Sequence, residues 1–415
     1  MSDAASFHST WSNLARIGRH PETGGYRRYA WTEPDLLLRE WFAAAAAERG
    51  LHMVEDGNGN QFAWWGDPAR GDAVLTGSHL DSVPDGGAYD GPLGVVSGFA
   101  ALDALRTKGF QPARPIGVAN FVDEEGSRFG IACAGSRLLT GALPPERARA
   151  LRDRDGHTLA DVLRRLGRDP DRLGADADLL GQIGTFVELH VEQGRGLVDQ
   201  AAAVGVASAI WPHGRWRFEF RGRADHAGTT RMDDRHDPML TYAMTALAAN
   251  KQAQLADARA TFGRVDVEPG GTNAIPSLVR AWLDARAADE STVAGLVRAV
   301  QRQAVERARR DGTSVQVEAE SVSRATTFDA ELRDRVAAAV AGPSHATVPV
   351  LPTSAGHDAG ILSSAGVPTA MLFVRNPTGV SHAPDEYAEP ADCEAGIAAL
   401  ARVLEDLAGP PDPGT

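Results

Sequence analysis

Three short apolar runs in the chain each end in a group of histidine or acidic residues. The runs cover residues 73–76, 116–122 and 185–189. Apolar runs of this length, separated by segments with a helical pattern, are typical of buried strands. Strands that alternate with helices predict an α/β layer architecture. Functional sites in such folds lie beyond the carboxyl ends of the strands, so we expect the three polar groups to meet there.

The first run leads into His79 and Asp81, which stand two positions apart. In an extended chain both side chains point to the same side. A carboxylate beside an imidazole fixes its tautomer and direction, which is what a metal-binding histidine needs. Asp90 follows in a glycine-rich turn, just before a predicted helix of small residues at about 94–108. This stretch therefore predicts part of a metal site.

The pattern changes near residues 207–212. Beyond this point the chain reads as strand 216–220, helix 237–256, strands 260–267 and 277–287, helix 291–310 and strand 313–319. The order β-α-β-β-α-β is the ferredoxin-like arrangement. A chain of 415 residues is also long for one average domain. We therefore expect a first domain built from residues 1–207 and 326–415, with a ferredoxin-like α+β domain inserted at 208–325.

Charge and composition exclude several classes of function. The net charge is −13 and the chain has no dense run of lysine or arginine, so nucleic acid and anionic membrane surfaces are not expected partners. The alanine-rich run 42–47 is far too short to span a bilayer. Residues 1–5 lack the features of a signal peptide, and two cysteines suit a reducing cytosol. We expect a cytoplasmic protein.

Five residues of the chain are candidate metal ligands, and they carry imidazole or carboxylate groups and no thiolate. Such a mixture suits zinc, manganese, cobalt or nickel. Five such ligands exceed what a single tetrahedral site with a bound water can use, and they suit two ions that share a carboxylate. Asp90, on its glycine-flanked turn, is the natural bridge. Glu124 lies next to Glu125, so one can bind metal while the other acts as a base on water. The five candidate ligands are His79, Asp90, Glu125, His190 and His382.

Each candidate also has an ordinary structural explanation. Asp90 is a favoured residue type for a helix N-cap. His79 could be a surface histidine, the Glu124–Glu125 pair a solvated loop, and His190 a satisfied histidine at a strand end. These ordinary explanations would all have to be true at once, which is far less expected than any one of them. The presence of all five candidates together therefore favours a metal site.

The motifs around these residues resemble the M20 metallopeptidase superfamily. Within it they resemble the amidase branch, which includes N-carbamoyl-L-amino-acid hydrolases, allantoate amidohydrolases and bacterial β-ureidopropionases. The resemblance covers almost the whole chain in the family's order. The matching motifs are residues 77–82 (Gly-Ser-His-Leu-Asp-Ser), 89–95 (Tyr-Asp-Gly-Pro-Leu-Gly-Val), 123–129 (Asp-Glu-Glu-Gly-Ser-Arg-Phe), 188–194 (Glu-Leu-His-Val-Glu-Gln-Gly), 225–230 (Asp-His-Ala-Gly-Thr-Thr), 356–359 (Gly-His-Asp-Ala) and 381–382 (Ser-His).

The resemblance implies a mixed-sheet metallohydrolase domain with two divalent metal ions. One ion would be held by Asp90 with His79 and His190, and the other by Asp90 with Glu125 and His382. Asp81 would orient His79, and Glu124 would be the general base. Histidine at position 190 follows the amidase branch, because peptidase members usually carry an acid there. One departure lies in residues 353–358, where relatives commonly have a second glycine.

The resemblance also assigns substrate contacts, several of them in the inserted domain. Arg286 would grip a carboxylate, and His226 would polarise the scissile carbonyl. Relatives are homodimers that pair through this lid domain, so some of these groups could reach the partner's site. Taken alone, Arg286 could be a surface arginine, His226 a loop histidine and Asn273 a turn residue. The implied substrate-binding residues are Gln193, His226, Asn273, Arg286, Gly356 and His357.

The expected reaction is hydrolysis of a ureido C–N bond in an N-carbamoyl acid, with release of ammonia and carbon dioxide. Allantoate and N-carbamoyl-L-amino acids are the two expected substrates, with a slight preference for allantoate. The alternatives are a β-ureidopropionase, an aminopeptidase or dipeptidase of the same superfamily, and a metal-dependent binding protein that has lost catalysis. A binding protein would be expected to lack a ligand or the base, and all are present here.

Overall fold

The computed structural model describes residues 3–342 and 347–410. The chain divides into two compact units. Unit 1 combines Met1–Ala209 with Thr327–Thr415, and unit 2 is Ile210–Thr326. The sequence placed these boundaries at 207/208 and 325/326, within two residues of the division. Each unit is described by itself below.

Unit 1 is organised around a mixed sheet in the order β1-β2-β4-β3-β5-β15-β6-β13, with β14 paired to β6. The centre of the sheet is parallel, because β3 pairs in parallel with both β4 and β5, and β5 with β15. The outer pairs β1–β2, β2–β4 and β15–β6 are antiparallel. The strands are β1 His52–Glu55, β2 Gln61–Trp65, β3 Ala73–His79, β4 Ile116–Phe121, β5 Ile183–Val191, β6 Val204–Ile210, β13 Thr326–Thr327, β14 Val350–Thr353 and β15 Thr369–Val374.

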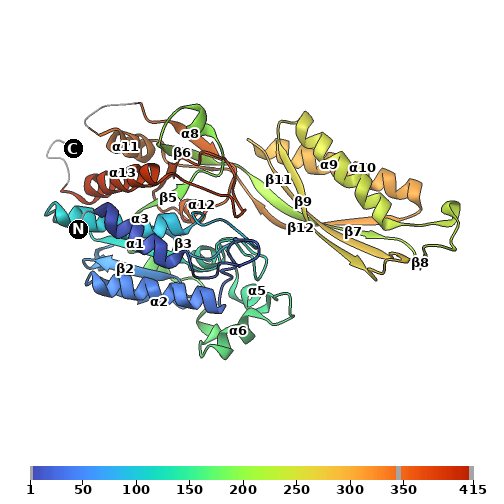
Figure 1. Cartoon of the computed structure of the whole chain (residues 1–415), viewed down its shortest axis with the longest axis horizontal. Helices are drawn as coiled ribbons and strands as arrows, with labels where there is room; N and C mark the ends of the chain where they lie inside the picture. The colour runs from blue at the N-terminus through green and yellow to red at the C-terminus, as the bar shows by residue number, and fades with distance from the viewer. Residues whose placement is uncertain (1–2, 343–346, 411–415) are drawn as a thin grey trace. The chain divides into compact units, whose positions relative to one another are not determined.

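Every residue of β3 and β4 is buried. Continuous apolar runs are what a parallel strand needs when both of its faces are covered. α3 is apolar on nearly all sides, and α13 packs beside it in the same core cluster (Figure 1). The helices of this unit are α1 Asp3–Leu14, α2 Glu33–Glu48, α3 Pro92–Thr107, α4 Ala134–Leu139, α5 Pro145–Ala150, α6 Leu159–Arg165, α7 Ala177–Leu180, α8 Gly196–Asp199, α11 Ala330–Ala341, α12 Asp358–Ser364 and α13 Pro390–Ala408.

Unit 2 has an antiparallel sheet in the order β12-β7-β11-β9. With α9 after β7 and α10 after β11, this is the expected β-α-β-β-α-β arrangement. A short ribbon, β8 with β10, extends from it. The elements are β7 His213–Arg221, β8 Asp225–His226, α9 Pro238–Leu255, β9 Arg259–Glu268, β10 Ala274–Ile275, β11 Leu278–Arg286, α10 Glu290–Asp311 and β12 Ser314–Ser323.

The sheet of unit 2 has one apolar and one charged face, because side chains alternate along each strand. Trp216, Phe218 and Phe220 of β7 are buried in a core cluster that includes residues of α9 and α10. Both helices begin at an aspartate. Asp237 accepts a hydrogen bond from Met239 N, and Asp289 accepts one from Thr292 N.

Candidate metal centre

The five predicted ligands come from five separate segments of unit 1. His79 ends β3, His190 lies near the end of β5, and Glu125 follows β4. Asp90 lies in the turn before α3, and His382 lies in the loop between β15 and α13. Because β3, β4 and β5 are parallel neighbours, their carboxyl ends lie at one edge of the sheet. The structure therefore brings together residues that stand far apart in the sequence.

The first ligand group is His79, Asp90 and His190, whose nearest donor atoms all lie within 4.8 Å of one another. His190 Nε2 is 3.1 Å from Asp90 Oδ1, and His79 Nε2 is 3.5 Å from the same oxygen. All three side chains are buried. Two imidazole nitrogens thus converge on one oxygen of Asp90.

The second group is Asp90, Glu125 and His382, and it meets the same distance limit. His382 Nε2 is 3.3 Å from Asp90 Oδ2 and 3.6 Å from Glu125 Oε1. Asp90 therefore directs one oxygen into each group. This is the arrangement in which a single carboxylate can bridge two ions.

The hydrogen bonding of these side chains fits a cation. Within the described residues, His79 Nε2, His190 Nε2 and Glu125 Oε1 are buried without a hydrogen-bond partner. The other ring nitrogens are engaged. His79 Nδ1 is 3.2 Å from the Asp81 carbonyl oxygen, and His190 Nδ1 is 2.9 Å from the Val191 carbonyl oxygen. With Nδ1 donating its proton, Nε2 presents a lone pair, as in metal-binding histidines. Unpartnered buried lone pairs cost free energy unless something binds them.

Gly91 gives His79 its space. A Cβ at this position would lie 2.4–2.6 Å from three atoms of the His79 imidazole, and the φ angle is +86°. Only glycine satisfies both conditions at no steric cost. Gly91 is also the N-cap of α3, so the structure assigns the cap to Gly91 and not to Asp90. The alternative explanation of Asp90 as a helix cap is therefore wrong.

Burial and mutual charge displace the pKa values of this cluster. Burial raises the pKa of Asp90, yet the adjoining imidazoles of His190, His382 and His79 bring it well below its usual range. Burial and the nearby Asp90 charge raise the pKa of Glu125 to about 7. Burial alone would lower the pKa of His382, but Glu125 and Asp90 raise it to about 9. The cluster holds protons where a divalent cation would supply positive charge.

Glu124 is buried beside the first group. Its Oε2 lies 3.6 Å from His79 Nε2, and its Oε1 accepts a hydrogen bond from the Cys133 thiol at 3.2 Å. Burial raises the pKa of Glu124 well above its usual value. Asp81 fixes the adjoining backbone, because its two oxygens accept the N–H groups of Glu124 and Glu125 at 3.1 Å each. Asp81 therefore supports both His79 and the glutamate pair.

Gln193 and His357 also lie at this cluster. Gln193 Nε2 donates to Asp90 Oδ2 at 2.7 Å and lies 3.2 Å from His382 Nε2. The His357 ring is 4.5 Å from the His190 ring, centroid to centroid. Gly356 immediately precedes His357, which is the N-cap of α12.

Sequence reasoning missed several supporting residues. Ser381 and Glu386 lie in the His382 loop, and their hydrogen bonds reach the Asp90 turn. Glu188 is buried and accepts a hydrogen bond from Ser78 at 2.8 Å. Ser78 directly precedes His79 and Glu188 stands two positions before His190, so proximity to a ligand in the sequence was the available signal. The thiol of Cys133 carried no signal in the sequence.

The substrate residues predicted in unit 2 fall at two places. His226 on β8 and Asn273 lie together, because Ala227 N donates to the Asn273 carbonyl oxygen at 2.9 Å. His226 Nδ1 accepts hydrogen bonds from the N–H groups of Gly228 and Thr229, so the neutral ring carries its proton on Nε2. Arg286 stands at the far end of β11, paired with His213 of β7. The structure does not bring Arg286 near the other two within this unit.

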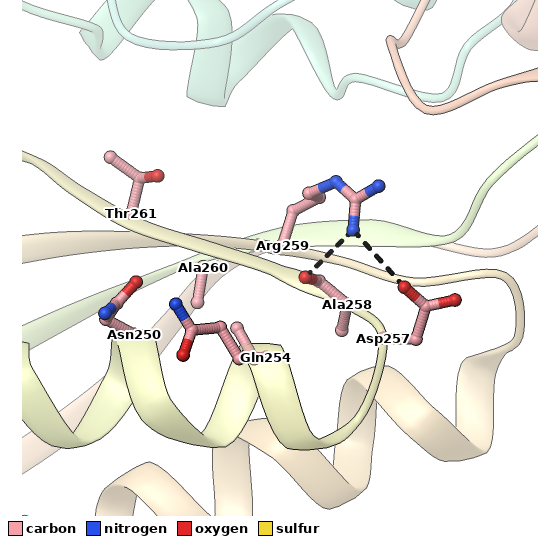
Figure 2. Close-up of a pocket in the computed structure, with 8 residues that line it drawn as sticks. Asn250, Gln254, Asp257, Ala258, Arg259, Ala260 and Thr261 are labelled. Carbon is pink, nitrogen blue, oxygen red and sulfur yellow. Dashed lines mark hydrogen bonds and ion pairs between the residues drawn. The ribbon is translucent and has the colours of Figure 1, made fainter.

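A depression of about 450 Å³ lies on unit 2 where α9 meets β9 (Figure 2). Its lining includes Asn250 and Gln254, together with Arg259, which pairs with Asp257 at 3.9 Å. Arg259 and Asp257 have exposed side chains. None of the candidate ligands lines this depression.

The family model of peptidase family M20/M25/M40 matches residues 75–406. The N-carbamoyl-L-amino acid amidohydrolase of Geobacillus stearothermophilus is 35% identical over 95% of this chain and 96% of its own length. The ureidoglycolate hydrolase of Arabidopsis thaliana is 32% identical over 92% of this chain and 82% of its own length. The allantoate amidohydrolase of Escherichia coli is 28% identical over 95% of this chain and 96% of its own length.

A solved structure described as an amidase of the hydantoinase/carbamoylase family, from Burkholderia vietnamiensis, superposes with a TM-score of 0.90 at 30% identity. The match covers 99% of this chain and 98% of that one. The chain belongs to peptidase family M20/M25/M40, and it is a hydrolase. The resemblance inferred from the motifs and the mixed α/β fold are both confirmed. Across the described residues, none of the helices combines the length and apolar character needed to cross a bilayer.

Proposed function

We propose that the chain is a dinuclear-metal amidohydrolase that cleaves a ureido C–N bond of an N-carbamoyl acid. The observation that carries this proposal is the position of Asp90, whose two oxygens point into two ligand groups. His79 and His190 would complete one metal site, and Glu125 and His382 the other. Zinc, manganese, cobalt and nickel all suit these donors. When bound, such ions polarise a carbonyl and lower the pKa of water.

Glu124 is the proposed general base. Its Oε2 lies 3.6 Å from His79 Nε2, beside the first ligand group, while the Cys133 thiol holds Oε1. It would take a proton from the attacking water and return it to the leaving nitrogen. Its burial supports this role, because a desolvated carboxylate is a stronger base than an exposed one.

His226 is the proposed donor to the developing oxyanion. Two backbone N–H groups occupy Nδ1, which leaves the Nε2 proton for a substrate oxygen. Arg286 would hold the substrate carboxylate through two parallel hydrogen bonds. Gln193, Asn273, Gly356 and His357 would complete the contacts.

The dimensions of β11 support a site built from two copies of the chain. The strand runs for 9 residues, so Arg286 lies about 27 Å from the end that adjoins the His226–Asn273 ribbon. This is several times the length of a small N-carbamoyl acid. Arg286 and the His226–Asn273 pair are therefore too far apart in unit 2 to contact one substrate molecule from the same copy of that unit. We propose that some of these groups serve the site of a partner chain.

The surface of α9 supports pairing through unit 2. Leu240, Met244 and Leu247 are 47%, 45% and 65% exposed and follow one face of the helix. Exposed apolar stripes of this kind mark interaction surfaces. We propose a homodimer, for which a mass near 88 kDa in light scattering, about twice the chain mass of 43.9 kDa, is expected. A monomer that retains full activity would contradict it.

The relatives support an N-carbamoyl-L-amino acid or allantoate as substrate, and the 35% identity to the Geobacillus enzyme favours the former. This reverses the slight preference for allantoate that the overall resemblance to bacterial chains gave. Ureidoglycolate is a further candidate from the plant relative. β-Ureidopropionase and peptidase activities are the alternatives, and His190 in place of an acid argues against a peptidase. We place the enzyme in the cytoplasm, because Cys133 and Cys393 are both buried free thiols.

The test is ammonia release by the manganese- or zinc-loaded protein from a panel of substrates. The panel contains N-carbamoyl-L-amino acids, allantoate, ureidoglycolate and N-carbamoyl-β-alanine, and a dipeptide is assayed beside it for peptide-bond cleavage. We expect turnover of one or more ureido compounds and an intact dipeptide. Dipeptide cleavage as the best activity would refute the assignment. A chain that binds metal but turns over none of the panel would point to the non-catalytic binding protein.

A further inference from the structure

Glu386 joins the two loops that carry Asp90 and His382. Its Oε1 accepts hydrogen bonds from the backbone N–H groups of Tyr89 and Asp90, each at 2.9 Å. Its Oε2 accepts a hydrogen bond from the Ser381 hydroxyl at 2.9 Å. One carboxylate thus uses both oxygens to hold the Asp90 turn against the residue next to His382.

The surroundings of Glu386 are built for this contact. The residue is 4% exposed. A Cβ on Gly87 would lie 2.3 Å from Glu386 Oε1 and 2.4 Å from its Cβ, so the turn approaches Glu386 more closely than any residue with a side chain permits. Ser381 Oγ lies 3.3 Å from Asp90 Oδ2, so the bracing also reaches the carboxylate itself.

The two ligand groups depend on this brace to different degrees. His79 and His190 stand on strands, and their side chains are 1% exposed. His382 stands on a loop, its side chain is 47% exposed, and its φ angle is +56°. That backbone conformation is costly for a residue other than glycine and persists only where the surroundings hold it. The His382 loop is the part of the centre that needs support.

We propose that Glu386 is a positioning residue that sets the second ligand group, Asp90 with Glu125 and His382. Without it, the N–H groups of Tyr89 and Asp90 lose their acceptor and Ser381 loses its partner. The distance between Asp90 Oδ2 and His382 Nε2 is then no longer fixed. The first group keeps His79 and His190 on their strands, so the second metal ion is lost selectively.

This inference rests on the proposed dinuclear centre, and metal binding tests it without an activity assay. The full-length chain is stripped of metal and titrated with manganese by calorimetry, and bound metal is counted after dialysis. The wild-type chain should bind two ions. In Glu386→Ala the first affinity should stay within about twofold, while the second should weaken about 10- to 100-fold, as loss of an outer-shell partner typically does.

Three further variants separate positioning from general damage. Glu386→Gln keeps an oxygen for the two N–H groups and should restore the second affinity to within about threefold of wild type. Glu386→Asp keeps the charge but is one methylene too short, so it should also weaken metal binding at the second site. This variant provides the test if Glu386→Ala does not fold. Asp385→Ala removes an exposed acid one position away and should leave both affinities unchanged. Thermal unfolding of the metal-free proteins reports their folding.

The outcomes separate the two proposals. Two ions bound with wild-type affinities by both Glu386→Ala and Glu386→Asp would overturn the role of Glu386 alone. An equal loss of both ions would make Glu386 a general support of the unit, which also overturns selective positioning. A wild-type chain that binds one ion would refute the dinuclear centre itself.

Discussion

Arg286 and Asp284 lie side by side on β11 and form a bidentate ion pair. Arg286 Nε donates to Asp284 Oδ1 at 2.7 Å, and Nη2 donates to Oδ2 at 2.9 Å. The two residues are two positions apart, so both project from the same face of the strand. Asp284 therefore fixes the plane of the guanidinium group, and that planar fork matches the geometry of a carboxylate.

Replacement of Arg286 should weaken binding of the substrate carboxylate. A hydrogen bond between charged groups contributes about 1.5–3 kcal/mol, so Arg286→Ala should raise KM on the order of 10- to 100-fold. Arg286→Lys should restore little of this, because an ammonium group cannot form two parallel bonds in a plane. Steady-state kinetics with the preferred N-carbamoyl acid measures both variants.

The matched control for Arg286 is Arg280, on the same face of β11. Arg280 pairs with the acidic residues Glu219 and Glu268. Arg280→Ala should leave KM within about twofold, because Arg280 is not among the proposed substrate contacts and a surface ion pair contributes little. An equal rise in KM for both variants would mean that the charge of the sheet, and not the position of Arg286, attracts the substrate.

Glu124 and Glu125 should differ in what their replacement removes. Glu124→Gln should lower kcat about 10²- to 10⁴-fold, the usual range for loss of a general base, while bound metal stays at the wild-type level. Glu125→Gln should reduce bound metal as well, because Glu125 Oε1 lies in the second ligand group. Metal analysis beside kinetics distinguishes the two. Intact turnover in metal-loaded Glu124→Gln would show that another group is the base.

Metal affinity should rise with pH. Burial alone would lower the pKa of His382, but nearby carboxylates raise it to about 9, and burial with the Asp90 charge raises the pKa of Glu125 to about 7. Below these values each group carries a proton that an incoming cation must displace. Manganese affinity should therefore increase from pH 6 to pH 9, most steeply below pH 7. Titrations in buffers of different ionisation enthalpy should report net proton release, and an affinity independent of pH would contradict the protonated cluster.

The sequence predicted the central elements of the fold because their patterns are local. The runs 116–122 and 185–189 became β4 and β5, and the period-2 alternation at 216–220 became β7. The helix at 330–341 and the strand at 204–210 were missed. α11 has only Val336 and Val340 buried, so its apolar pattern is short. β6 begins in a small-residue stretch and is defined by its antiparallel pairing with β15, which local sequence does not encode.

Most of the candidate ligands were predictable, because His79, His190 and Glu125 lie at or just beyond strand ends and Asp90 lies in a glycine-rich turn. The residues that support them were not predictable, since Glu386 and Cys133 act through tertiary contacts. Cys133 reaches Glu124 from 9 positions away, and Glu386 reaches Asp90 from 296 positions away. The distance between Asn273 and Arg286 could not be predicted either. It depends on the chain between them forming one extended strand, β11. The candidate ligands could thus be identified from the sequence, whereas the residues that support them could be identified only from tertiary contacts.

A buried acid that is not itself a candidate ligand should make folding stability depend on pH. Asp35 in α2 is 3% exposed, and its Oδ2 accepts a hydrogen bond from Trp31 N at 2.8 Å. Burial raises the pKa of Asp35 from 3.8 to about 6, despite the nearby charge of Arg39. The folded state therefore binds this proton more tightly than the unfolded state. The resulting stabilisation is fully present below pH 3.8 and is lost as the pH rises through 6.

Asp35→Asn removes the charge and keeps an oxygen that can accept from Trp31 N. Relative to wild type, the variant should gain unfolding free energy as the pH rises from 4 to 8, by on the order of 2–3 kcal/mol. Urea unfolding of the metal-free proteins at several pH values measures the difference, and metal is left out because its binding also depends on pH. Asp385→Asn changes an exposed carboxylate and should show no such trend. A constant difference between Asp35→Asn and wild type across this range would mean that Asp35 stays ionised in the folded chain, held by Arg39.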